Sequence, residues 1–333
     1  MLVRINTFAR ALIVMCLTLA GAGAAKKPAS DVAESGPAVF WRDPGDIESR
    51  DLFYGPGGSQ DQPRGPYTFV KEDLDGSNPK FVVRGSDGVK WKVKLGVEAR
   101  PETVATRIVW AVGYFANEDY FLPDLQVENM PAHLHRGQKL VAADGSIHNV
   151  RLKREDEKKL GEWAWRRCPF SGTREWNGLR VLMAVLNNWD LKDENNSVYR
   201  RASSDRIYMV SDLGASFGTA GASWPLWKAK GNLNSYTNSN FIRRRTTASV
   251  DFDVPARPRF LYLLHPRNYF SRLRMRWIGR NVPRSDARWM GDVLSRLSDR
   301  QIQDAFRSAG YSEPELEGFS KVVESRIKLL AEL

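Results

Sequence analysis

Residues 89–95 alternate between apolar and basic side chains and predict a half-buried β-strand early in the chain. The two sets have a period of two: Trp91, Val93 and Leu95 on one face, Lys90, Lys92 and Lys94 on the other. Two strand-like segments, 68–72 and 80–84, come before it, separated by turns rich in Gly, Asp and Ser. The segment 102–115 then has helical spacing, and Pro101 suits a first turn. A small sheet carrying one helix is therefore expected.

The rest of the chain has a mainly helical pattern. After two further expected strands, 125–129 and 147–153, short strands are expected only around Tyr199 and over 207–210. Helices are expected over 155–166, 174–186, 286–297, 298–309 (with Ser298 as N-cap) and 314–333. The predicted class is α+β, with a small β-rich part followed by a larger, mostly helical one.

Composition sets the broad class. The chain has 333 residues, 42% of them hydrophobic, and its 11 tryptophans exclude a disordered or collagen-like protein. Two cysteines cannot form a disulfide framework for this length. The formal net charge of +11 favours anionic partners, such as phosphorylated ligands, nucleic acid, anionic lipid or acidic polysaccharide, without choosing among them.

The first 25 residues have the pattern of a secretory signal peptide. Arg4 and Arg10 precede a short apolar run, and small residues end the segment at 22–24. We expect a secreted or periplasmic protein whose net charge falls to +9 after cleavage, because residues 1–25 contain two arginines and no acid. The remaining cysteine, Cys168, is expected to be a buried small hydrophobe. Residues 26–66, rich in Gly and Pro, are expected to form an extended leader.

A polar loop directly after the apolar helix 174–186 contains the residues best suited to chemistry. Asp190 and Asn195 lie five apart with Lys192 between them, and Asp212 follows two residues after the apolar strand 207–210. Phosphoryl transfer requires these residue types: a carboxylate near the attacking hydroxyl, oxygen ligands for Mg²⁺ or Mn²⁺, and a cation for the phosphates.

These motifs resemble those of the protein-kinase-like superfamily. The segment 190–195 (DLKDEN) is similar to the D-L-K-x-x-N catalytic loop, and 212–214 (DLG) is similar to D-F-G. Asn188 and Trp189 replace the usual histidine and arginine, and neither G-x-G-x-x-G nor A-P-E is present. The pattern is closest to the atypical branch, which includes HipA-type kinases and the secretory-pathway, Golgi casein kinase-like kinases.

The resemblance implies a bilobal fold, with an N-lobe over 67–153 and a C-lobe over 154–333. It also implies roles for individual residues. These are Asp190 and Lys192 in catalysis, Lys94, Glu102, Ser77 and Asn78 in nucleotide binding, and Asn195 and Asp212 as metal ligands. Lys92 could replace Lys94, and Asn196 could replace Asn195. The implied cofactors are ATP or another nucleoside triphosphate, with Mg²⁺ or Mn²⁺.

The expected function is phosphoryl transfer from a metal-bound nucleotide to a hydroxyl on a protein, glycan or small molecule. Because ATP is scarce outside the cytoplasm, the alternative is a catalytically weak, pseudokinase-like module that binds an anionic cell-envelope polymer. A carboxylate-pair glycan hydrolase using Asp190 and Asp212 is a third hypothesis.

Basic residues after position 240 either form a solvated face or attract an acidic polymer or an anionic membrane surface; no specific nucleic acid is expected. They are Arg243, Arg244, Arg245, Arg272, Arg274, Arg276 and Arg280. His133 and His135 are expected in a surface loop rather than at a metal, since no further ligand motif accompanies them.

Overall fold

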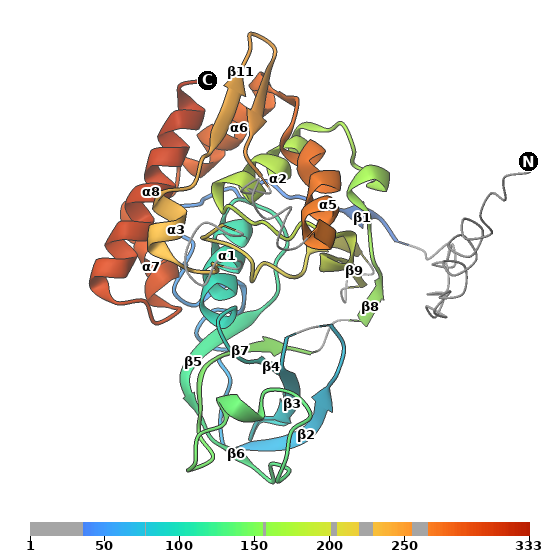
Figure 1. Ribbon diagram of the computed structural model, residues 1–333, viewed down its shortest axis with the longest axis vertical. Helices are drawn as coiled ribbons and strands as arrows, with labels where there is room; N and C mark the ends of the chain where they lie inside the picture. Colours follow the sequence, from blue (N-terminus) through green and yellow to red (C-terminus); the bar gives the residue numbers. More distant parts are fainter. Residues whose placement is uncertain (1–35, 77, 156–157, 201–204, 220–228, 255–265) are drawn as a thin grey trace, which may run out of the picture. The chain divides into compact units, whose positions relative to one another are not determined.

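A six-stranded sheet forms the first part of the molecule (Figure 1). The computed structural model describes residues 36–76, 78–155, 158–200, 205–219, 229–254 and 266–333. Within these ranges, the sheet has the order β5-β7-β4-β3-β2-β6, antiparallel except where β6 joins β2. Its strands are β2 (Tyr67–Asp73), β3 (Lys80–Arg84), β4 (Lys90–Lys94), β5 (Asp119–Leu125), β6 (Val127–Glu128) and β7 (Ile147–Arg154).

The alternation seen in the sequence decides which face of this sheet is buried. Trp91 and Val93 of β4 are almost fully buried and pack with Phe81, Val83 and Leu152 in the core of the sheet. The predicted strands 68–72, 80–84, 89–95 and 147–153 are confirmed. The strand predicted over 125–129 corresponds only to the end of β5 and to β6.

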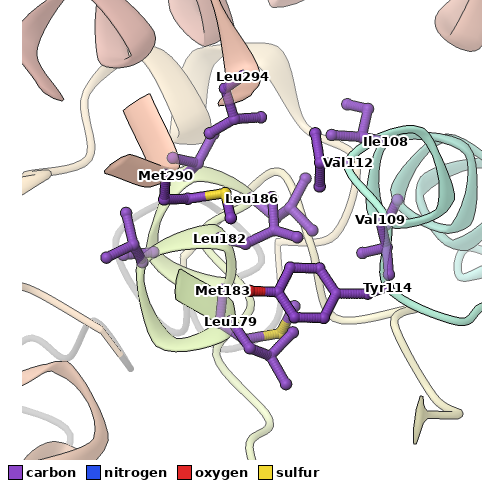
Figure 2. Close-up of a cluster of buried hydrophobic side chains, with 14 of the residues drawn as sticks. Ile108, Val109, Val112, Tyr114, Leu179, Leu182, Met183, Leu186, Met290 and Leu294 are labelled. Carbon is purple, nitrogen blue, oxygen red and sulfur yellow. The ribbon is translucent and has the colours of Figure 1, made fainter. Parts of the chain in front are cut away.

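Helix α1 (Ala99–Ala111) follows β4 but belongs to the core of the helical part. Ile108 and Val109 on α1, with Val112 just beyond it, face apolar side chains on or next to α2 (Arg174–Val185) and α6 (Arg284–Leu294) (Figure 2). These partners are Leu179, Leu182, Met183, Leu186, Met290 and Leu294. Each fully buried side chain of this kind contributes about 1.5–3 kcal/mol. Hydrophobic burial therefore fixes α1 against the helical part.

The helical part begins with α2 and ends with three consecutive helices. Among the described residues, its helices are α2 (Arg174–Val185), α3 (Leu233–Thr237), α5 (Pro266–Met275), α6 (Arg284–Leu294), α7 (Asp299–Arg307) and α8 (Glu313–Ala331). Short 3₁₀ turns are η1 (Gly55–Gly57), η2 (Gln138–Leu140), η3 (Trp165–Arg167), η4 (Asp193–Asn195) and η5 (Arg276–Gly279). Ser298 caps α7, as predicted, and the structure adds a capping box with Gln301. None of the described helices combines the length and the hydropathy of a membrane span.

Two small sheets complete the described fold. One has the order β1-β10-β9-β8 and the other β11-β12-β13. Their strands are β1 (Ala38–Val39), β8 (Lys158–Gly161), β9 (Asn196–Arg200), β10 (Arg206–Val210), β11 (Ile242–Arg245), β12 (Ser249–Phe252) and β13 (Val282–Pro283). From the expected leader, residues 36–66 contribute β1 and the buried side chains of Phe40, Ile47 and Leu52.

The helix predicted over 155–166 is wrong. Residues 158–161 form β8, which pairs with β9, and a 3₁₀ turn follows. Trp163 is buried and donates from Nε1 to the Met209 carbonyl oxygen at 3.0 Å. Pairing with a distant strand and burial of this indole therefore override the helix-favouring run of Glu and Lys. The α+β class, with a curled β-rich lobe and a helical C-terminal lobe, is confirmed.

Candidate functional site

Strand pairing places Lys94 beside Arg151, its register partner on β7. Residues in register share one face of a sheet, and here Glu102 on α1 meets that face. Glu102 Oε2 lies 2.7 Å from Lys94 Nζ, and its Oε1 lies 2.8 Å from the Arg151 guanidinium. The Glu102 side chain has no solvent exposure. The predicted lysine–glutamate pair is therefore formed inside the protein, with an arginine that sequence reasoning had not identified.

The ionic cluster continues away from Lys94. Asp119 lies 3.9 Å from Arg151 and 3.1 Å from Arg107, and Thr106 donates to it at 2.9 Å. Burial raises the pKa of Asp119 to about 6, although the two arginines act in the opposite direction. Positive and negative side chains alternate along this cluster in the protein interior. Each buried charge is therefore compensated by the opposite charges of its neighbours.

Lys94 also reaches the end of strand β10. Asp212 Oδ1 lies 3.2 Å from Lys94 Nζ and accepts a hydrogen bond from Gly214 N at 3.2 Å. Burial opposes ionisation of both groups. The carboxylates of Glu102, Asp212 and Glu98 nevertheless raise the pKa of Lys94 above its ordinary value. Lys94, with the hydrogen bond from Gly214 and the charge of Arg151, lowers the pKa of Asp212 to about 2. Both groups are charged at neutral pH.

Asn195 ties the polar loop to Asp212. Its carbonyl oxygen accepts hydrogen bonds from the backbone N–H groups of Ser211 and Asp212, at 2.8 and 3.2 Å. Its side-chain amide donates to the carbonyl oxygen of Asp190 at 2.5 Å. Asn196, the alternative ligand, is buried and donates to the Trp163 carbonyl oxygen instead. The geometry therefore favours Asn195 over Asn196.

Asp190 lies in a second group of charges on the same loop. Its carboxylate is 3.1 Å from Lys192 Nζ and 3.9 Å from the guanidinium of Arg272 on α5. Arg272 is buried, lies 4.0 Å from the Trp189 ring centroid and donates to the Trp189 carbonyl oxygen at 2.8 Å. Of the arginines expected on a solvated face, this one instead supports the loop that carries Asp190.

Glu98 is a site residue that sequence reasoning missed. It lies 3.1 Å from Lys94 Nζ, and it also accepts from the amide of Asn78 and pairs with Lys230. The carboxylates of Glu98, Glu102 and Asp212 offer oxygen atoms within 4.8 Å of one another. Lys94 ends a strand and Glu98 precedes α1, so their spacing of four residues was no helical signal for the contact. No local signal indicated Lys230, which reaches Glu98 through the tertiary fold.

The structure thus brings most of the predicted site residues together. Lys94, Glu102 and Asp212 share one ion cluster, Asn78 reaches it through Glu98, and Asn195 reaches it through its backbone. The ion pairs of Asp190 and Lys192 belong to the neighbouring Arg272 group. Ser77 lies outside the described residues, as does the segment 1–35 that contains the expected signal peptide.

Other candidates lie elsewhere. Lys92, the alternative to Lys94, pairs with Asp73 and Glu155 at 3.0 and 2.8 Å. His133 and His135 are exposed, as expected, and His135 pairs with Glu72. Cys168 is buried and is not in a disulfide.

The side chains at the site suit a divalent cation and a phosphate. Asp212 is ionised and its side chain is 38% exposed, and the neighbouring Asn195 carries a side-chain amide oxygen as a second candidate ligand. Carboxylate and amide oxygens are the ligands that Mg²⁺ and Mn²⁺ prefer, and a lysine ammonium is a common phosphate partner. The residues present therefore fit both expected groups.

Comparisons with family models and with curated protein sequences found no match. Among solved structures, a proinflammatory kinase of Helicobacter pylori, CtkA, is similar with 13% identity and a TM-score of 0.44, over 80% of this chain and 96% of that one. The Golgi casein kinase is similar with 10% identity and a TM-score of 0.36, over 80% of this chain and 73% of the other. Both likenesses are remote, in sequence identity and in TM-score.

Proposed function

We propose that this chain is an atypical kinase-like phosphotransferase that moves the terminal phosphoryl group of a metal-bound nucleoside triphosphate to a hydroxyl acceptor. One observation carries the proposal. Lys94 Nζ is shared between Glu102 on α1 and Asp212 at the end of β10, at 2.7 and 3.2 Å. A cation held by buried carboxylates, here Glu102 and Glu98, beside a partly exposed carboxylate is an arrangement that suits orienting phosphates next to a metal ion.

Binding of the nucleotide is assigned to Lys94, Asn78, Asp212 and Asn195. Lys94 orients the inner phosphates, and Glu102 holds its ammonium in place. Asn78, in the turn between β2 and β3, contributes an amide donor. Asp212 and Asn195 would hold Mg²⁺ or Mn²⁺, which supplies charge neutralisation for the phosphates when it is bound. Most of the rate enhancement would come from positioning and from electrostatic stabilisation.

Transfer itself is assigned to Asp190 and Lys192. The acceptor oxygen forms a bond to the terminal phosphorus as the bond to the bridging oxygen breaks, and the nucleoside diphosphate leaves with that electron pair. The Asp190 carboxylate takes the proton of the acceptor hydroxyl, and Lys192 offsets negative charge on the transferred group. Asp212 has a lowered pKa, so it does not suit the proton donor of a carboxylate-pair hydrolase.

The expected signal peptide places this reaction outside the cytoplasm, in the periplasm or the medium, as part of the proposal. The acceptor is then a hydroxyl on a protein, a glycan or a small molecule. The alternative is a catalytically weak binding module for an anionic envelope polymer. Its support is the exposed arginines of the β11–β12 hairpin, Arg243, Arg244 and Arg245.

A transfer assay with labelled ATP tests the proposal. The wild type, with Mg²⁺ or Mn²⁺, should release the terminal phosphate to water or to an added hydroxyl acceptor. Asp190→Asn should lower that rate by about 10²- to 10⁴-fold while nucleotide still binds. The control Asp292→Asn, at an exposed position of α6, should leave the rate unchanged. If Asp190→Asn and the control show equal rates, Asp190 is not the proton acceptor.

A further inference from the structure

The carboxylate of Glu98 lies where residues from four segments of the chain meet. Its Oε2 accepts from Lys94 Nζ at 3.1 Å and from the side-chain amide of Asn78, and its Oε1 pairs with Lys230. Gly214 packs so closely that a Cβ atom placed there would lie 2.8 Å from Glu98 Cβ. Four parts of the chain therefore converge on this one side chain. They are the end of β4, the β2–β3 turn, Lys230 and the segment after Asp212.

The partners of Glu98 are all donors. Two are lysine ammonium groups and one is a side-chain amide, and the Glu98 side chain is only 7% exposed. Phosphate oxygens require the same set, because they accept hydrogen bonds and carry negative charge. The donors that surround Glu98 are therefore equally suited to bind a phosphate group in its place.

Lys230 is the member of this set that the proposed mechanism does not use. Its side chain is 10% exposed, and its Nζ lies 5.4 Å from the ring centroid of Trp189, the residue before Asp190. The backbone on both sides is fixed: the Ala229 carbonyl oxygen accepts from Trp189 Nε1 at 3.1 Å, and Gly231 N donates to the Ser216 carbonyl oxygen at 3.0 Å. Lys230 is thus held between Glu98 and the loop that carries Asp190.

Charge at the site is balanced in the absence of nucleotide. Three carboxylates, from Glu98, Glu102 and Asp212, face three cations, from Lys94, Arg151 and Lys230. A nucleoside triphosphate adds several negative charges to this group. Transfer of Lys230 and Asn78 from Glu98 to the phosphates would supply donors for those charges without any new residue entering the site.

We propose that Lys230 is a second phosphate-binding cation, on the side of the transferred phosphoryl group, and that Glu98 competes with that phosphate for it. Lys230 is assigned to the transferred group because its ammonium lies over the ring of Trp189, the residue before Asp190. Lys94 instead contacts Asp212. This inference rests on the proposed function and adds a residue and a built-in competitor to the same site.

Binding of ATP and of ADP to the full-length chain, each with Mg²⁺, separates Lys230 from Lys94. Lys230→Met should lower the affinity for ATP by about tenfold, which corresponds to the loss of one charge-assisted hydrogen bond, and should lower the affinity for ADP much less. Lys230→Arg should restore part of the ATP affinity. Glu98→Gln keeps the shape and removes the competing charge, so it should bind ATP more tightly than the wild type. The control Lys321→Met removes a lysine from an exposed ion pair on α8 and should match the wild type.

The possible outcomes are distinct. If the wild type binds neither nucleotide, the proposed function fails. If the wild type binds both and Lys230→Met weakens ATP and ADP binding equally, Lys230 does not contact the transferred phosphoryl group and the inference fails. Weaker ATP binding in Glu98→Gln would also overturn it, because Glu98 would then act as a metal ligand rather than as a competitor. A melting temperature for each variant shows whether the variant has folded.

Discussion

Lys94 at the end of β4 places its ammonium 3.2 Å from a carboxylate oxygen of Asp212, which lies 118 residues further along the chain. The contact joins the six-stranded sheet to the end of β10. Glu102 holds the same ammonium from α1, which is anchored in the core of the helical part. One lysine therefore links three elements, and the proposed nucleotide site is built around it.

Removal of the Glu102 charge should strongly destabilise the fold. Glu102→Gln would remove the carboxylate that Lys94 and Arg151 share, while both cations would stay buried. Breaking a buried ion pair in this way costs about 3–5 kcal/mol, since an uncompensated charge remains. Urea unfolding measures the loss.

Glu317→Gln is the matched control for that measurement. Glu317 pairs with Lys321 at 3.6 Å on the surface of α8, and both side chains are mostly exposed. Exposed pairs contribute little, so a change within about 0.5 kcal/mol is expected. Equal effects of the two substitutions would show that the buried cluster does not depend on Glu102.

The pH dependence of stability should report the Asp212 contact. The pKa of Asp212 in the folded chain is about 2, below its ordinary value of 3.8. A lowered folded-state pKa means that the stabilisation is fully present above the unfolded pKa and is lost as the pH falls toward the folded one. The wild type should therefore lose more stability than Asp212→Asn between about pH 5 and pH 2.

The difference between the two unfolding curves isolates this group from the other carboxylates that titrate in the same range. The difference in stability between the wild type and Asp212→Asn should become smaller as the pH falls. A difference that stays constant from neutral pH down to pH 2 would mean that Lys94 does not stabilise ionised Asp212.

Arg272 should act on catalysis as a positioning residue. Its guanidinium stacks on Trp189, binds the Trp189 carbonyl oxygen and lies 3.9 Å from Asp190. Arg272→Ala should release the loop and lower kcat for phosphoryl transfer by about 10- to 100-fold, with KM for ATP nearly unchanged. Steady-state kinetics separate the two quantities.

The control for Arg272 lies on the same helix. Arg274 is exposed on α5, and Arg274→Ala should leave kcat unchanged. A purely structural role for Arg272 would instead lower the amount of active protein without changing kcat per active site. A rise in KM with constant kcat would place Arg272 at the nucleotide.

Local patterns were enough to predict the main strands and most of the helices. The period-two run ending at Lys94, the apolar helix 174–186 and the cap at Ser298 each lie within one segment. Asp190, Asn195 and Asp212 could be selected because each stands at the end of, or in a loop next to, an apolar element. The helix predicted over 155–166 failed because a partner strand about forty residues away decided its conformation.

Long-range partners could not be predicted in the same way. Arg151 follows from the register of β4 with β7, and Arg272 from the packing of α5 on Trp189. Lys230 stands in an irregular stretch with no periodicity that would indicate its direction. Such contacts depend on the tertiary fold, and the sequence around each of them is unremarkable.

The most direct test of the nucleotide site is the effect of Mg-ATP or Mn-ATP on the melting temperature of the wild type and of Asp212→Ala. Bound nucleotide stabilises the folded state by mass action, so the melting temperature of the wild type should rise with nucleotide concentration. Asp212→Ala, shown to be folded by its own melting transition, should show no such rise. An equal rise in both proteins would contradict the assignment of Asp212 to the metal–nucleotide site.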